Sequence, residues 1–239
     1  MAQDKGSPKV SGRTVQRYLK SIGWTKLVPF KSPYLTARMK ATRVQWCKDH
    51  IDLDWSNVFF SDESLFQLYR ITQRQWEKTR QAIAVPKHSP AVMVWGAMSA
   101  RGLSPIAFIP GHIDSTKYAI VMDHNLLDTM NTLYPDGWLY QQDNAPVHTS
   151  KLTKKWFEDH GVRLITWPPG STDLNPIEVL WAIIKRRIEA KNPSNVNDLK
   201  AEIEKIWEEM STSTIKSLID SMPARLQKCI ELNGETIKM

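Results

Sequence analysis

The run Trp55-Ser-Asn-Val-Phe-Phe-Ser-Asp62 places aromatic and β-branched residues directly before an acid. This composition predicts a β-strand over residues 56–61. The next letters, Glu63-Ser64, indicate that the strand breaks into a turn and leaves Asp62 at its end. Aspartate is common in turns without any further role, so this stretch alone favours a structural Asp62.

A second run, Trp138-Leu-Tyr-Gln-Gln-Asp143, repeats the arrangement of an apolar stretch that ends in an acid. It predicts a strand over residues 138–142 with Asp143 directly after it. Catalytic groups often lie at strand ends, but an Asx-turn before Pro146 would use the same letters. Both interpretations of Asp143 remain open on this pattern.

A third acid, Glu178, lies early in a predicted amphipathic helix over residues 176–190. Asn175-Pro176 is typical of a helix start, and in a capping box Glu178 would reach back to Asn175. That interpretation is the simpler one locally. The apolar stripe of this helix, however, leaves Glu178 on its flank, where a carboxylate can face a cleft beside the sheet; the stripe comprises Ile177, Leu180, Trp181, Ile184 and Ile188.

Two predicted strand ends and a helix start can bring Asp62, Asp143 and Glu178 together, with 34 residues between the last two. Three converging carboxylates favour Mg²⁺ or Mn²⁺, which prefer oxygen ligands. Two such ions can activate an attacking oxygen and stabilise a leaving oxygen in phosphodiester chemistry. The combination therefore predicts an enzyme that cuts and joins nucleic-acid strands.

The rest of the chain predicts an α/β fold, with a mixed five-stranded sheet flanked by helices. The expected strands are 56–61, 65–70, 91–98, 138–142 and 162–167. The expected helices are 116–130, 149–160, 176–190, 196–210 and 213–232.

Composition and charge limit the class of protein. The longest apolar run is too short to span a bilayer, and the two cysteines indicate neither a disulfide framework nor a cysteine-based zinc site, so an intracellular protein is expected. Residues 1–50 carry a net charge of +9 and residues 51–239 carry −2. A basic arm on a nearly neutral body is typical of phosphate-backbone binding, although a solvated tail would look similar.

The basic arm contains a predicted short helix, with Ser11 as its cap and Gly23 just past its end. It resembles the recognition helix of a helix-turn-helix whose earlier helices are absent. We therefore expect residues 1–25 to be a remnant of a DNA-binding domain, 26–50 a basic linker and 51–239 the catalytic domain. The expected DNA contacts are Arg13, Gln16, Arg17, Lys20, Lys26 and Lys31.

Two further polar residues, Asn144 and His148, lie close behind Asp143. Either could contact or orient the acids, and His148 could also donate to a phosphate. A lone histidine at a helix start is more often a capping or core residue. Both interpretations of His148 remain open.

Four sequence blocks together resemble the Tc1-like branch of the Tc1/mariner DDE transposases: Ser61–Ser64, Val94–Ala97, Gln142–Thr149 and Trp167–Trp181. The resemblance runs from about residue 10 to the C-terminus and implies an RNase H-like fold. It also implies that Asp62, Asp143 and Glu178 form the metal-binding triad and hold two Mg²⁺ or Mn²⁺ ions.

The family mechanism implies metal-dependent cleavage of DNA at transposon ends, then transfer of the 3′-hydroxyl strand to TA sites in target DNA. The resemblance also implies a homodimer, double-stranded DNA as partner, no membrane association and location in the nucleus. The chain departs from the usual pattern at Thr172 and Val179 and in its short N-terminal part. A catalytically silent or truncated derivative that binds DNA or dimerises is therefore the alternative.

Overall fold

The computed structural model describes residues 11–25, 34–68 and 89–238. The chain consists of two compact units, Met1–Pro33 and Tyr34–Met239. In the described part of the first unit, α1 spans Gly12–Ser21, with the Ser11 hydroxyl accepting from the Thr14 amide at 3.2 Å. The predicted N-terminal helix and its cap are therefore confirmed. No residue of α1 is buried.

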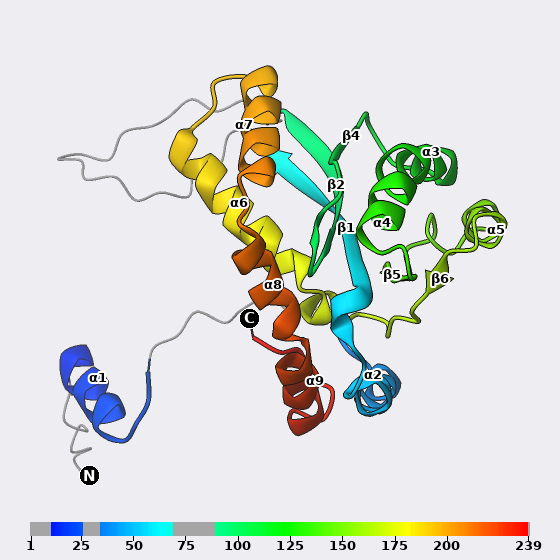
Figure 1. Ribbon diagram of the computed structural model, residues 1–239. Helices are drawn as coiled ribbons and strands as arrows, with labels where there is room; N and C mark the ends of the chain where they lie inside the picture. Colours follow the sequence, from blue (N-terminus) through cyan, green and yellow to red (C-terminus); the bar gives the residue numbers. More distant parts are fainter. Residues whose placement is uncertain (1–10, 26–33, 69–88, 239) are drawn as a thin grey trace, which may run out of the picture. The chain divides into compact units, whose positions relative to one another are not determined.

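The second unit is organised around β1 (Val58–Gln67), the central strand of a mixed sheet (Figure 1). β1 pairs antiparallel with β2 (Ala91–Ser99) and parallel with β5 (Leu139–Gln141). β6 (Arg163–Leu164) continues the sheet beyond β5. Beyond β2 lies β3 (Gly102–Leu103), and β4 (Ala107–Ile109) also pairs with β2.

The mixed sheet is confirmed, but its strands differ from the prediction. The described parts of the predicted strands 56–61 and 65–70 do not form two strands, and positions 69 and 70 lie outside the described residues. β1 runs without a break through Asp62, which pairs with Gly96. The expected turn at Asp62 was wrong because the ladder to β2 satisfies the backbone of these polar residues. With β3 and β4 added, the sheet in the described residues has six strands rather than five.

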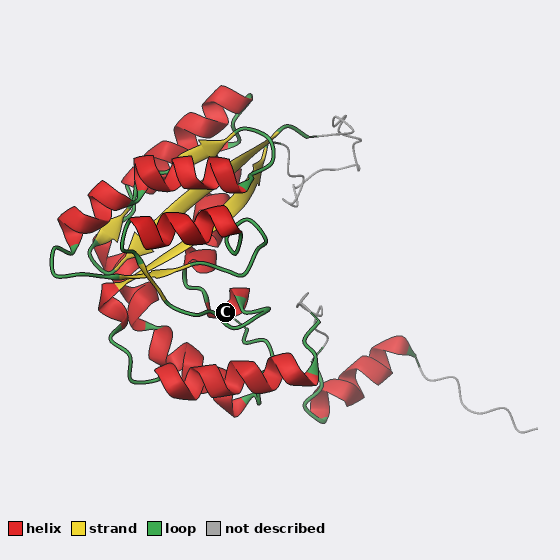
Figure 2. Ribbon diagram, turned by 90° about the vertical axis from the view of Figure 1, so that its right-hand side faces the viewer, coloured by secondary structure: helices red, strands yellow, loops and turns green. Residues whose placement is uncertain are grey.

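Helices cover both faces of this sheet (Figures 1 and 2). One face packs against α3 (Ser115–Asn125), α4 (Leu127–Leu133) and α5 (Lys151–Asp159), with Phe59 in its core. The other packs against α6 (Ile177–Lys191), α7 (Val196–Glu208) and α8 (Thr212–Asp220), with Phe60 in its core. Successive side chains of a strand face opposite sides, which explains why Phe59 and Phe60 belong to different cores.

Two expected helices are each divided in two. Residues 116–130 form α3 and α4, which join almost continuously at Leu126. Residues 213–232 form α8 and α9 (Met222–Glu231), with Ser221 between them and Pro223 in the first turn of α9. Proline has no amide hydrogen, so it fits a helix start better than a helix interior.

One helix in the basic N-terminal segment belongs to the second unit. α2 (Ala37–His50) packs against α9 and buries Arg43, Trp46 and Cys47. Arg43 therefore does not contribute to an exposed basic arm, although sequence reasoning counted it there. None of the helices in the described ranges is long and apolar enough to cross a membrane.

Candidate active site

The three predicted acids line one pocket of about 260 Å³. Asp62 comes from β1, Asp143 follows β5, and Glu178 lies in the first turn of α6. Phe60 pairs with Gln141 across the parallel strands, so Asp62 and Asp143 each lie two residues beyond the same rung of the ladder. The segment Trp167–Thr172 also lines the pocket and forms part of its wall. The structure thus brings all three acids together.

Asn175 positions Glu178 beside β1. Its side-chain amide donates to the Ser61 carbonyl at 3.1 Å, which joins the start of α6 to the residue next to Asp62. Its backbone amide donates to the Thr172 carbonyl at 3.0 Å rather than to Glu178. The capping-box interpretation of Glu178 is therefore not what the structure shows, and its carboxylate lines the pocket.

Asp62 and Glu178 lie in an environment that disfavours negative charge. Burial and the neighbouring carboxylates, Glu178 first, raise the pKa of Asp62 to about 8. Burial also raises the pKa of Glu178; the charge of Lys185 opposes that shift, and Asp143 adds to it. Buried acids that repel one another bind a proton, or a cation, more readily than isolated acids do.

Asp143 differs from its two partners because hydrogen bonds stabilise its charge. Burial acts to raise its pKa, but contacts from His148 and the Ala145 amide outweigh it, and the pKa is lowered. His148 Nδ1 lies 2.5 Å from Asp143 Oδ1, and His148 Nε2 lies 3.3 Å from Glu63 Oε1. Burial lowers the pKa of His148, but the two carboxylates outweigh it and raise the pKa to about 9.

These contacts show what His148 and Asn144 touch in the folded chain. His148 is buried at 4% exposure, yet its ring nitrogens face acids rather than apolar side chains or a helix start. Asn144 lines the pocket and donates to the Trp167 carbonyl at 2.8 Å, which connects the Asp143 loop to the Trp167–Thr172 segment.

Sequence reasoning missed Glu63 and the role of Asn175. Glu63 lies inside the Ser61–Ser64 block. Because a turn was expected there, the sequence did not indicate which side of the sheet its side chain faces. In the continuous strand, Asp62 and Glu63 face opposite sides of the sheet. The contact between Asn175 and Ser61 joins residues far apart in sequence, and no local pattern signals it.

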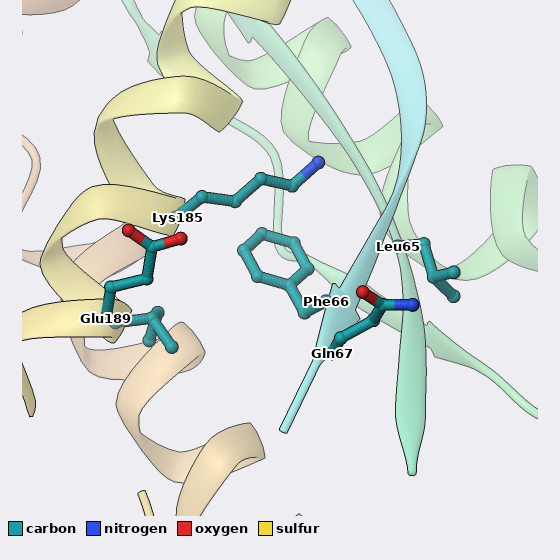
Figure 3. A pocket seen from close by; sticks show the side chains of 6 residues that line it. Leu65, Phe66, Gln67, Lys185 and Glu189 are labelled. Atoms are coloured by element: carbon teal, nitrogen blue, oxygen red, sulfur yellow. The ribbon is translucent and has the colours of Figure 1, made fainter. Parts of the chain in front are cut away.

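A second pocket, of about 230 Å³, lies farther along the same helix (Figure 3). Leu65, Phe66 and Gln67 of β1 line it together with Lys185 and Glu189 of α6. The Lys185 ammonium lies 5.4 Å from the centre of the Phe66 ring. The charge of Lys185 also lowers the pKa of Glu178, against the effect of burial.

The expected DNA contacts fall into two groups. Arg13, Gln16, Arg17 and Lys20 are exposed on α1. Lys26 and Lys31 lie outside the described residues. The structure describes the α1 unit by itself, so these positions stay predictions.

The donor chemistry of the pocket fits a hard divalent cation. Its three carboxylates offer oxygen ligands, and their mutual repulsion would be relieved by positive charge. Within the described ranges, no three His, Cys, Asp or Glu side chains are packed closely enough to form a ready-made metal cluster. The pocket therefore matches a divalent cation in the type of ligand atoms it offers, but its side chains are not already arranged as a metal site.

Comparison with known proteins gives the same family as the four sequence blocks. A family model described as "DDE superfamily endonuclease" matches residues 57–200, which include all three acids. The chain belongs to the Tc1/mariner family of DDE transposases. A helix-turn-helix family model described as "Transposase" matches residues 2–52.

Two curated transposases illustrate this membership. The chain is 31% identical to the Tcb1 transposase of Caenorhabditis briggsae and 32% identical to the Tc1 transposase of Caenorhabditis elegans. Each alignment covers 97% of this chain and 89% of the relative.

The fold also matches solved transposase structures. The Mos1 mariner paired-end complex with Mn superposes with a TM-score of 0.80 at 16% identity, covering 96% of this chain and 72% of that one. The catalytic domain of Mos1 transposase superposes with a TM-score of 0.69 at 15% identity, covering 87% of this chain and all of that one. The expected RNase H-like α/β fold is confirmed.

Proposed function

We propose that this chain catalyses cut-and-paste DNA transposition, with Asp62, Asp143 and Glu178 as its metal-binding triad. It would cleave DNA at transposon ends and transfer the 3′-hydroxyl strand to TA sites in target DNA. The observation that carries the proposal is the single pocket lined by three acids from β1, the β5 end and α6.

The cofactor would be Mg²⁺ or Mn²⁺, with two ions in the pocket. Mos1 paired-end complexes have been solved with Mn and with Mg, which supports this choice. When bound, such ions would activate the attacking oxygen and stabilise the leaving oxygen. The three carboxylates would hold them, and the burial and repulsion that raise the pKa of Asp62 favour that binding over an empty, fully charged pocket.

The remaining residues would prepare this pocket for DNA. Asn175 holds Glu178 against β1, and Asn144 holds the Asp143 loop against the Trp167–Thr172 wall. The exposed cations of α1 would contact phosphates without reading the sequence. The partners would be double-stranded DNA and a second copy of the chain, and the protein would act in the nucleus.

Nicking of supercoiled plasmid in the presence of Mn²⁺ tests this proposal. We expect the purified chain to nick the plasmid, Asp143→Asn to lose that activity, and Asp136→Asn, which changes an exposed acid, to retain it. Equal nicking by Asp143→Asn would identify a contaminant and contradict the proposal. No nicking by any variant, including on pre-cut transposon-end DNA, would instead support a silent derivative that only binds DNA or dimerises.

A further inference from the structure

Glu63 lies directly beside Asp62 but faces the other side of the sheet. Phe60 and Phe66, which alternate in phase with Asp62, belong to the core against α6. Phe59, in phase with Glu63, belongs to the core against α3 and α5. β1 therefore presents one acid to the pocket and the next to His148, which lies on the segment just before α5.

The contacts to Asp143 are concentrated on one of its two oxygens. Oδ1 lies 2.8 Å from the Ala145 amide and 2.5 Å from His148 Nδ1. A carboxylate held by two donors on one oxygen has a fixed rotation about its last bond. Oδ2 is then the oxygen that Asp143 can present to a cation in the pocket.

His148 is itself held on several sides. Its other ring nitrogen faces Glu63, and its ring lies against Tyr118 with 4.4 Å between ring centres. Gln142 donates to the His148 carbonyl at 3.2 Å and accepts from the Tyr118 hydroxyl at 2.8 Å. The contacts with Glu63 and Tyr118 would break if the ring turned, so its direction is set by β1 and α3.

We propose that Glu63 and His148 are positioning residues: Glu63 fixes the His148 ring, and His148 fixes Asp143 so that Oδ2 faces the acidic pocket. This inference rests on the proposed function, because it takes Asp143 as a metal ligand. β1 would then position two of the three acids. It carries Asp62 itself, and through Glu63 and His148 it fixes the orientation of Asp143. Partners that orient a metal ligand commonly change metal affinity by about 10–100-fold when they are removed.

Two substitutions of His148 separate positioning from general packing. The amide nitrogen of asparagine falls near the place of Nδ1, so His148→Asn keeps a donor for Asp143. The amide nitrogen of glutamine falls near the place of Nε2, so His148→Gln keeps a donor for Glu63 alone. Glu63→Gln preserves size and removes only the charge that holds the ring. His124→Gln, an exposed histidine on α3, is the matched control.

The readout is the Mn²⁺ dissociation constant of the full chain without DNA, measured from the electron paramagnetic resonance signal of free Mn²⁺. We expect His148→Gln to weaken binding by about tenfold or more, His148→Asn by less than about threefold, and Glu63→Gln by an intermediate factor. His124→Gln should bind as the wild type does. Circular dichroism of each variant establishes that it is folded.

Equal affinity of His148→Gln and the wild type would overturn the inference, and so would equal losses in His148→Asn and His148→Gln. If His148→Gln failed to fold, Glu63→Gln would decide, and its unchanged affinity would overturn the inference. Asp62→Asn, measured in parallel, tests the underlying function. Mn²⁺ binding that survives Asp62→Asn contradicts the proposed site, whereas binding lost in Asp62→Asn but intact in His148→Gln contradicts only the positioning role.

Discussion

Asp173 and Asp62 are both largely removed from solvent, but their surroundings are opposite in character. Asp173 accepts from the Arg43 guanidinium at 2.8 and 2.7 Å and from the Ile237 amide at 2.8 Å. Burial and the charges of Glu178, Glu63 and Asp143 raise the pKa of Asp62. The two regions are close in sequence, because Asp173 lies just before α6 and Glu178 just inside it.

The difference separates an acid whose charge is neutralised inside the fold from acids whose charges repel one another, which we propose bind cations. Arg43 also donates to the carbonyls of Gly170 and Gly234, so it joins α2, the pocket wall and the C-terminal segment. Among the described residues, the charged groups that act on Asp62 are the acids Glu178, Glu63 and Asp143. A protein that leaves buried charges repelling one another gives up stability at that place, which is typical of functional sites.

The largest expected effect on stability is at the Arg43–Asp173 ion pair. Arg43→Met should lower the free energy of unfolding by about 3–5 kcal/mol, because it leaves the Asp173 charge buried without its partner. Urea denaturation measures the loss. The double variant Arg43→Met/Asp173→Asn should be more stable than Arg43→Met alone. If it is not, the uncompensated charge of Asp173 is not the cause.

The next effect concerns Gly234, whose carbonyl accepts from Arg43. Its φ is +80°, and an added Cβ would lie 2.3 Å from the Lys40 carbonyl oxygen. Gly234→Ala should therefore destabilise by at least about 2 kcal/mol, as backbone strain and overlap act together. Gly161→Ala is the control, because Gly161 has φ +63° but nothing within 4 Å of the added carbon. Equal losses in the two variants would mean that the close approach to α2 does not matter.

The opposite sign is expected in the pocket. Asp62→Asn should raise the free energy of unfolding of the metal-free protein at pH 8, because a charge disfavoured by burial is removed. The pKa of Asp62 is about 8 when folded, above its ordinary 3.8, so the folded state binds the extra proton between these values. The wild type should therefore be less stable than Asp62→Asn by an amount that grows as pH rises from about 4 to 8. This difference in the free energy of unfolding should vanish below about pH 4.

Thermal unfolding of both proteins across this pH range makes the measurement. A difference that is constant with pH would show that Asp62→Asn acts through packing. A wild type more stable than Asp62→Asn at pH 8 would contradict the comparison itself.

The smallest expected effect is at a pair that belongs to neither region. Lys155 and Asp159 form an ion pair at 2.8 Å on the exposed surface of α5. Lys155→Gln should leave the melting temperature unchanged within error, since such pairs are screened by water and salt. A clear loss of stability would mean that exposed pairs matter here as much as the Arg43–Asp173 pair.

The sequence predicted the elements that have a clear local pattern of apolar and polar residues. The helices α5, α6 and α7 follow from apolar periodicity, and the three acids were expected together from their places after strands and in a helix start. The strand through Asp62 was mistaken for a turn, because its polar letters stay extended only through pairing with β2. Arg43 looked like one more basic residue of an exposed arm, since its partner Asp173 is distant in sequence and only packing of α2 reveals it.

The most direct test of the central claim, that Asp62, Asp143 and Glu178 form a cation site, is the melting temperature with and without Mn²⁺ at pH 7.5. A ligand that binds only the folded state stabilises it by about 2.7 kcal/mol at 100 times its dissociation constant. The wild type should therefore melt several degrees higher in Mn²⁺, and Asp62→Asn and Glu178→Gln should show little or no shift. An absent shift in the wild type, or equal shifts in all three proteins, would contradict the account.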